Sequence, residues 1–168
     1  MKIRLSTMND ISLIMDIIKQ AQDNFKLMGI NQWQNNYPNP SVIQNDIESN
    51  ESYVIIINHK IVGTFVLSLR NESTYDIIYD GDWLSHEGYA VIHRIAFDIS
   101  VKGKGLSKSV LNYIYQQCTN QNVCSIKIDT HEDNIIMSNM LISNGFSKCG
   151  TIFLRDGNKR IAYEKLLK

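Results

Sequence analysis

The sequence is short of the residues that hold small secreted domains and metal ribbons together. Its three cysteines are an odd number and include no C-x-x-C pair, so a disulfide framework is not expected and a zinc ribbon is excluded by spacing. The four histidines are scattered without ligand spacing, so no metal site is expected. We interpret the cysteines as reduced, mostly buried thiols of a cytoplasmic protein.

The chain also lacks net charge and long apolar runs. Seventeen basic residues balance seventeen acidic ones, which gives no global attraction to nucleic acid or to an anionic membrane. The longest purely apolar run, residues 53–57, is far below the ~20 residues of a membrane span. The N-terminal residues show no apolar signal-peptide segment. We therefore expect an intracellular protein with neither a nucleic-acid nor a membrane partner.

The length of 168 residues and a hydrophobic content of 43% suit one domain over residues 1–168. Apolar periodicity predicts the order β-α-α-β-β-β-α-β-α-β-β. Ser41 is expected to cap the second helix, and Asn58 and His59 to form a hairpin turn. The fold expected is α/β (α+β), with a mixed, mostly antiparallel sheet of six to seven strands flanked by about four helices. The strands are expected at 2–5, 53–57, 61–69, 89–97, 125–130, 146–154 and 160–166, and the helices at about 11–28, 41–49, 106–120 and 134–144.

Residues 92–107 carry the most informative pattern: a buried strand, a glycine-containing loop and the start of a helix. Such a junction directs several backbone N–H groups to one point at the positive end of the helix dipole. Gly103 and Gly105 allow close approach of an anion, and Lys102 and Lys104 add positive charge. The segment therefore predicts a phosphate or pyrophosphate cradle.

Two common phosphate motifs do not fit this loop. Aligning Lys108 and Ser109 on the P-loop motif puts Lys102 and Ser107 where its two glycines belong. The dinucleotide fingerprint fails because Lys108 stands at its third glycine. Coenzyme A is the remaining ligand class.

At this point the chain resembles the GNAT superfamily of N-acetyltransferases. That family's loop has Arg or Gln, two residues, Gly, one residue, then Gly or Ala; here Lys102, Gly105 and Ser107 occupy the three fixed positions. Asn134, followed later by Asn144-Gly145-Phe146, resembles a second family segment. The order of strands and helices also matches, so the resemblance covers nearly all of the chain.

The resemblance implies acetyl-CoA or coenzyme A as the cofactor. The pantetheine arm is expected at the backbone of Ile95, Ala96 and Phe97, with Asn134 and Met137 on the other side of the arm. The pyrophosphate is expected on the loop formed by Lys102, Gly103, Lys104, Gly105, Leu106 and Ser107.

Acetyl transfer to an amine needs a base, and His93 is the candidate. Strand alternation puts His93 on the side of Ile95 and Phe97, unless a bulge breaks the parity, and arylalkylamine acetyltransferases of the same superfamily have a histidine at the corresponding strand position. Many family members use a tyrosine as general acid, and that position here is Leu141. Water, Cys149 and Tyr163 are the remaining proton donors.

The acceptor is expected to be a primary amine of a small molecule or peptide. Residues 72–87 carry five acidic side chains, among them Asp76, and neither lysine nor arginine. Such a segment would attract a cationic amine. By resemblance, Trp33 and Gln34 wall the acceptor cleft, and His131 contacts the cofactor or the substrate.

The leading hypothesis is an acetyl-CoA-dependent N-acetyltransferase with direct attack in a ternary complex. The alternative is a non-catalytic acyl-CoA-binding sensor or regulatory protein of the same fold, because the usual tyrosine is missing. Members of the superfamily are often dimers, so a homodimer is the assembly expected.

Overall fold

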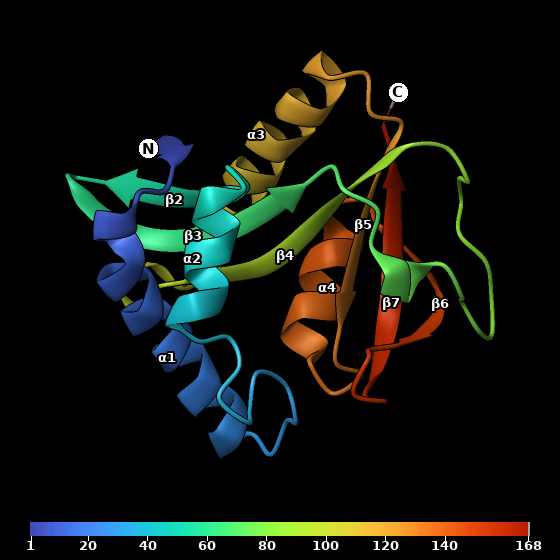
Figure 1. Ribbon diagram of the computed structural model, residues 1–168, viewed down its shortest axis with the longest axis horizontal. Helices are drawn as coiled ribbons and strands as arrows, with labels where there is room; N and C mark the ends of the chain where they lie inside the picture. The colour runs from blue at the N-terminus through green and yellow to red at the C-terminus, as the bar shows by residue number, and fades with distance from the viewer. Residues whose placement is uncertain (168) are drawn as a thin grey trace. The chain divides into compact units, whose positions relative to one another are not determined.

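The computed structural model describes residues 1–167, and its elements follow the predicted order (Figure 1). The helices and strands are β1 (Lys2–Leu5), α1 (Ile11–Leu27), α2 (Pro40–Glu48), β2 (Ser52–Ile57), β3 (Lys60–Ser68), β4 (Tyr89–Phe97), α3 (Leu106–Asn120), β5 (Ser125–Thr130), α4 (Ile135–Ser143), β6 (Ser147–Phe153) and β7 (Lys159–Leu166). Three short 3-10 turns lie at Met8–Asp10, Ser73–Tyr75 and Ile99–Val101.

The seven strands follow the spatial order β1-β2-β3-β4-β5-β7-β6. Strands β4 and β5 pair in parallel through Tyr89, Ala90 and Val91, whereas β1–β2, β2–β3, β5–β7 and β6–β7 pair in antiparallel. This confirms the predicted mixed, mostly antiparallel sheet with four α-helices in the described part of the chain. No helix within residues 1–167 is long and apolar enough to cross a membrane.

The chain divides into two compact units. The first contains Met1–Ser68 and Ile92–Leu106, and the second contains Leu69–Val91 and Ser107–Lys168. Strand β4 contributes its first part to the second unit and its second part to the first. That the chain forms one functional domain stays a prediction.

The first unit packs α1 and α2 against β2 and β3 (Figure 1). Its core joins Ile14 and Ile18 of α1 to Ile43 and Ile47 of α2 and to Val54 of β2. In each helix these residues are four positions apart and so lie on one face. Burying each such side chain contributes about 1.5–3 kcal/mol, which fixes the helices on the sheet.

The start of α2 differs from the sequence-based expectation. Its N-cap is Asn39, whose Oδ1 accepts from the backbone N–H of Val42 (3.2 Å), and not Ser41. Pro40 takes the first helical position, where its missing N–H is no loss and its fixed φ suits the helix. The predicted turn at Asn58 and His59 is confirmed, since both residues have positive φ (48° and 63°) between β2 and β3.

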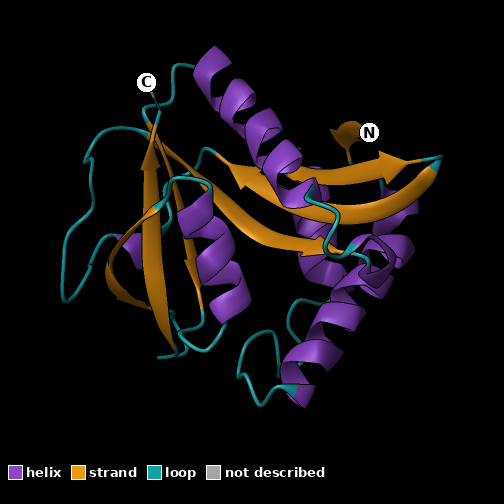
Figure 2. Cartoon of the chain, turned by 180° about the vertical axis from the view of Figure 1, so that it is seen from behind, coloured by secondary structure: helices purple, strands orange, loops and turns teal. Residues whose placement is uncertain are grey.

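The core of the second unit combines residues of β4, β6 and β7 with two aromatic residues of the segment before β4. Tyr75, Trp83, Val91, Cys149, Ile152 and Ala162 are all buried there. Helix α4 lies along β5, β6 and β7 (Figure 2), and α3 meets the start of β6 through the rings of Tyr115 and Phe146. Residues 72–87 contain the short turn Ser73–Tyr75 and an isolated antiparallel bridge between Tyr79 and Thr151 of β6. Tyr75 and Trp83 pack this segment into the core.

Candidate active site

Strand β4 contains an irregular residue between the candidate base and the residues predicted to receive the cofactor. Arg94 has a φ of 50°, a left-handed conformation in the middle of a strand. For a non-glycine residue this conformation costs roughly 1–2 kcal/mol. The alternation that puts His93 on the side of Ile95 and Phe97 holds only for a regular strand, and the left-handed Arg94 is the kind of irregularity for which that prediction makes an exception. The role of His93 stays a prediction.

The side chain of Arg94 is held by two partners from other elements of the first unit. Its Nε and Nη2 donate to the two carboxylate oxygens of Asp46 on α2 (2.8 and 2.7 Å), and Nη1 donates to the Tyr37 hydroxyl (2.8 Å). The Arg94 and Asp46 side chains are 14% and 7% exposed. Burial lowers the pKa of Arg94, but Tyr37 and Asp46 more than offset this, so the pKa lies above its ordinary value.

The loop that follows β4 is anchored to α1. Gln20 donates to the Asp98 carboxylate (2.9 Å) and accepts from the backbone N–H of Ile99 (2.9 Å). Hydrogen bonds from Ser100 and Gln20 hold the pKa of Asp98 below its ordinary value. The loop therefore leaves the strand at a fixed point.

The predicted phosphate cradle is a turn in which the backbone N–H groups of Lys102 and Lys104 donate to the carbonyl oxygens of Ile99 and Val101 (3.2 and 3.4 Å). Gly103 and Gly105 both have left-handed φ (77° and 69°), and a Cβ at either position would meet no atom within 4 Å. Lys102, Gly103, Lys104 and Gly105 are exposed, and α3 begins at Leu106. The first N–H groups of a helix have no partner within the helix. The open glycine backbone, the two lysines and the helix N-terminus together fit a pyrophosphate.

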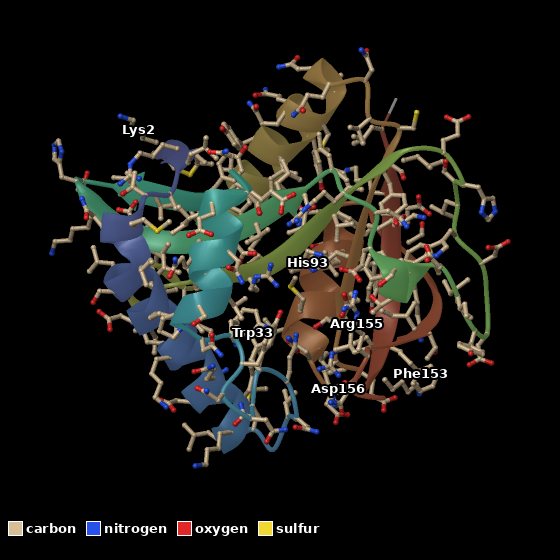
Figure 3. All side chains as sticks on the ribbon, in the orientation of Figure 1. Lys2, Trp33, His93, Phe153, Arg155 and Asp156 are labelled. Atoms are coloured by element: carbon tan, nitrogen blue, oxygen red, sulfur yellow. The ribbon has the colours of Figure 1, made fainter. Side chains whose placement is uncertain are left out.

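The candidate residues of the first unit differ in their exposure. Ala96 is buried, and His93, Ile95 and Phe97 are partly buried on β4. Figure 3 labels His93 on this strand and Trp33 on the loop between α1 and α2. These positions are compatible with the predicted roles, which stay predictions.

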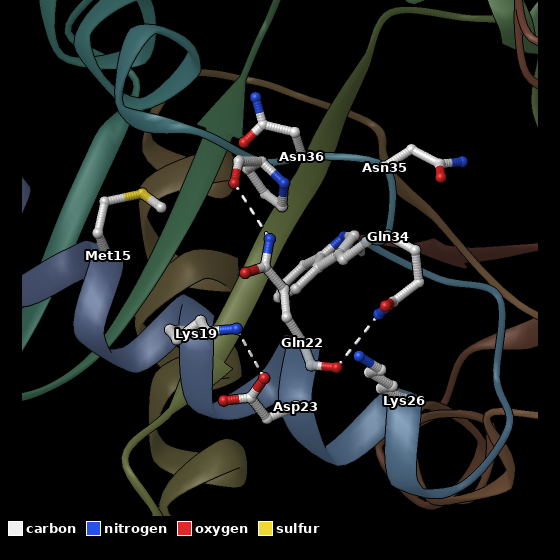
Figure 4. A pocket seen from close by; sticks show the side chains of 10 residues that line it. Met15, Lys19, Gln22, Asp23, Lys26, Gln34, Asn35 and Asn36 are labelled. Atoms are coloured by element: carbon white, nitrogen blue, oxygen red, sulfur yellow. Dashed lines mark hydrogen bonds and ion pairs between the residues drawn. The ribbon is translucent and has the colours of Figure 1, made fainter.

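Trp33 and Gln34 line a cavity of about 480 Å³ on α1 and the following loop (Figure 4). Trp33 meets the ring of Phe25 edge to face at 5.7 Å, and Gln34 donates to the carbonyl oxygens of Gln22 and Gln32 (3.1 and 3.0 Å). The wall of this cavity is thereby fixed. The lining residues are Met15, Lys19, Gln22, Asp23, Lys26, Trp33, Gln34, Asn35, Asn36 and Pro38.

The other candidates lie in the second unit. Asn134 is buried and caps α4, because its Oδ1 accepts from the backbone N–H of Met137 (3.2 Å). His131 precedes this cap, and its Nδ1 accepts from the backbone N–H of Asp133 (3.2 Å). Asp76 is exposed and accepts from Asn71 (3.3 Å). The cofactor and acceptor contacts of these residues stay predictions.

The candidate proton donors are all in the core. Leu141, at the position of the usual tyrosine, is fully buried, and Cys149 and Tyr163 are almost fully buried. Burial, together with the charge of Glu164, raises the pKa of the Cys149 thiol. Which of water, Cys149 and Tyr163 gives the proton stays open.

A buried charged cluster of the second unit was not predicted from the sequence. Lys127 lies with its Nζ 4.2 Å from the ring centre of Trp83 and 4.0 Å from that of Tyr89. Glu164 is its cross-strand neighbour and accepts from the backbone N–H groups of Leu84 (2.6 Å) and Ser85 (3.3 Å). Burial lowers the pKa of Lys127, and Glu164 partly opposes this. The cluster fastens residues 84 and 85 to β7.

Sequence reasoning missed Arg94, Asp46, Gln20, Lys127 and Glu164. The alternation of β5 and β7 could have suggested Lys127 and Glu164, since both fall on apolar strands. No signal in the sequence marks Arg94 as left-handed, because arginine has no preference for that conformation.

Comparisons with known proteins agree with this geometry. The Acetyltransferase (GNAT) family model matches residues 17–146. A GNAT-family acetyltransferase from Streptococcus agalactiae is 32% identical, with a TM-score of 0.90 over 99% of this chain and 95% of that one. A GNAT-family acetyltransferase from Listeria monocytogenes is 21% identical, with a TM-score of 0.75 over 99% and 94% of the two chains.

The protein yncA of Salmonella typhimurium, solved with its cofactor acetyl-CoA, has a TM-score of 0.67 at 15% identity, covering 100% of this chain and 94% of that one. The comparison with curated proteins gives no match.

The mixed seven-stranded sheet, with β4 leading through a glycine loop into α3, matches the fold of a solved GNAT acetyltransferase. The chain belongs to the GNAT acetyltransferase family. Membership confirms the predicted family and its general activity, acetyl transfer with acetyl-CoA as the cofactor.

Proposed function

We propose that the protein transfers the acetyl group of acetyl-CoA to a primary amine, by direct attack in a ternary complex. The observation that carries this proposal is the continuous run from β4 through the left-handed glycines to the start of α3. The proposed acceptor is a cationic small molecule or a peptide amine.

Bound acetyl-CoA would supply an activated acetyl thioester. The residues that would hold it are the backbone of Ile95, Ala96 and Phe97 for the arm and the loop of residues 102–107 for the pyrophosphate. The side chains of Lys102 and Lys104 are exposed next to this loop and would add charge neutralisation. An N–H near Phe97 would polarise the thioester carbonyl.

His93 is proposed as the general base. An amine attacks in its neutral form, so its proton has to be taken up by a group with a pKa near neutrality. His93 is partly buried on β4, immediately before the left-handed residue.

Exposed acidic side chains support a cationic acceptor. Asp76, Asp80, Asp82 and Glu87 are all exposed on residues 72–87, and this segment is held in place by Glu164. A fixed field of one sign raises the local concentration of an oppositely charged substrate. A homodimeric assembly and a cytoplasmic location remain part of the proposal.

The test is coenzyme A release from acetyl-CoA with a panel of amines: a polyamine, an amino sugar and a lysine-containing peptide. At least one amine should be turned over, and His93→Ala should lower kcat/KM by about 10²–10⁴-fold with acetyl-CoA binding retained. His59→Asn, at the exposed turn between β2 and β3, is the control, because asparagine tolerates the positive φ of that position; its kcat/KM should equal that of the wild type.

The burial of Leu141 at the usual tyrosine position favours one second candidate. A sensor or regulatory protein would bind acetyl-CoA and turn over no amine of the panel. Binding without turnover would therefore replace the catalytic proposal by this one.

A further inference from the structure

Arg94 combines a left-handed backbone conformation with a position inside a β-strand. Within residues 1–167, the other non-glycine residues with positive φ lie in loops and turns, and most of them are Asn, Asp or His. Arg94 lies inside β4 with a φ of 50°. An unfavourable conformation of this kind persists where the surrounding structure over-determines it, and such residues cluster at functional sites.

The surroundings of Arg94 over-determine its conformation. Its guanidinium is paired through two hydrogen bonds with Asp46 and through a third with Tyr37, all between 2.7 and 2.8 Å. These partners come from α2 and from the loop before it. A bidentate pair fixes the orientation of the guanidinium as well as its position. Three separate segments of the first unit thus meet on one side chain.

These bonds also indicate how the guanidinium is used. Nε and Nη2 are directed to Asp46, and Nη1 is directed to Tyr37. Three of the five guanidinium N–H donors are used in this way, and only 14% of the side chain is exposed. Its effect is therefore on the backbone that carries it.

The position of Arg94 in the chain determines which backbone is affected. His93 precedes it, and Ile95, Ala96 and Phe97 follow it. In a regular strand, successive peptide groups point to opposite sides. One left-handed residue turns the following peptide groups away from that pattern, as a strand bulge does. The conformation at position 94 therefore sets how the main chain of residues 95–97 is presented relative to His93.

We propose that Arg94 is a positioning residue, whose pairing with Asp46 and Tyr37 holds the left-handed turn in β4 and so presents the backbone of residues 95–97 to acetyl-CoA. This inference rests on the proposed function of that backbone. The inference goes beyond that function because it states what aligns the backbone, namely a buried ion pair of the first unit.

The test compares Arg94→Ala with Arg94→Gly. Both variants lose the ion pair, but glycine adopts positive φ at no steric cost whereas alanine does not. If the backbone conformation matters, Arg94→Ala should raise the KM for acetyl-CoA about tenfold, equivalent to ~1.4 kcal/mol. Arg94→Gly should recover most of this loss and stay within about threefold of the wild type. The KM for the amine should change less than the KM for acetyl-CoA in both.

Asp46→Asn supplies the second half of the test. On its own it should raise the KM for acetyl-CoA, because it weakens the pair that holds the turn. Combined with Arg94→Gly, it should not raise the KM for acetyl-CoA any further, because no guanidinium remains for Asp46 to bind. Residues that interact show such non-additivity. Tyr37→Phe removes one hydrogen bond at an exposed side chain. It should give a small change in the same direction, and it serves as a readout if the other variants fold poorly.

Two results would overturn the inference. Variants with lower thermal midpoints but a wild-type KM for acetyl-CoA would mean that the ion pair is only structural. A loss in Arg94→Gly as large as in Arg94→Ala would mean that the backbone conformation is not what matters. Failure of the wild-type protein to bind acetyl-CoA would instead refute the proposed function, so the two failures are distinguishable.

Discussion

Replacing Glu164 by glutamine should lower the free energy of unfolding of the second unit considerably, although it exchanges only one carboxylate oxygen for an NH₂ group. Glu164 is fully buried, and its Oε2 accepts from Leu84 (2.6 Å) and Ser85 (3.3 Å). Within residues 1–167 its Oε1 has no hydrogen-bond partner. A glutamine would therefore put its NH₂ group either against the N–H of Leu84 or into this partnerless position.

The magnitude follows from these contacts. A buried donor without a partner costs about 1–3 kcal/mol, and hydrogen bonds to a charged group are worth more than neutral ones. Lys127, buried opposite Glu164 between two aromatic rings, also loses a nearby negative charge. We expect a loss of about 2 kcal/mol, or ~4–8 °C in Tm for a chain of this size.

Thermal unfolding measures this effect, and Glu132→Gln is the matched control. Glu132 pairs with Lys159 at an exposed site (3.1 Å), where such pairs contribute about 0–1 kcal/mol. Glu164→Gln should also make residues 84 and 85 more accessible to limited proteolysis, because their anchor is weakened. A variant as stable as the control would refute the account of this cluster.

The remaining predictions concern other parts of the fold. A hydrogen bond from Arg4, with others from Thr7, lowers the pKa of Asp10 from 3.8 to about 2. The wild type should therefore be more stable than Asp10→Asn by ~1 kcal/mol, after allowance for solvent screening. This difference should be present above pH 3.8 and lost as the pH falls through 2. Urea unfolding at several pH values measures the difference, and a difference that does not depend on pH would contradict the prediction. Asn134→Ala should cost about 1 kcal/mol through loss of the α4 cap, whereas an unchanged Tm would mean that the cap contributes nothing. In Gly81→Ala the new Cβ would lie 1.9 Å from the Cys149 carbonyl oxygen. We therefore expect the free energy of unfolding to fall by about 3 kcal/mol or more. A folded variant with the wild-type Tm would show that the backbone can move to accept the Cβ.

The order of the elements could be predicted from the sequence because each amphipathic segment carries its own period. Ile14 and Ile18 mark one helix face whatever lies elsewhere in the chain. The phosphate loop could be predicted for a similar reason, since Gly103 and Gly105 are needed locally for its left-handed turns. Local chemistry was enough for both features.

The parts that could not be predicted depend on residues far apart in the chain. The side chain of the left-handed Arg94 pairs with Asp46, 48 positions away, and no local rule assigns this backbone conformation to arginine. The cluster of Lys127 and Glu164 forms because residues 72–87 fold back on the strands. The cap of α2 was misassigned to Ser41 because Asn39 and Pro40 together form the better start.

The central claim, that this chain is an acetyl-CoA-dependent enzyme, is tested most directly by the binding of acetyl-CoA to the full chain. Thermal unfolding with acetyl-CoA, coenzyme A, ATP and NAD added separately measures it, because a ligand of the native state raises the midpoint by mass action. The thermal midpoint should rise with acetyl-CoA and with coenzyme A, and should not rise with ATP or NAD. No rise with acetyl-CoA at concentrations well above micromolar would show that the loop of residues 102–107 is not a working cradle, and would contradict the account.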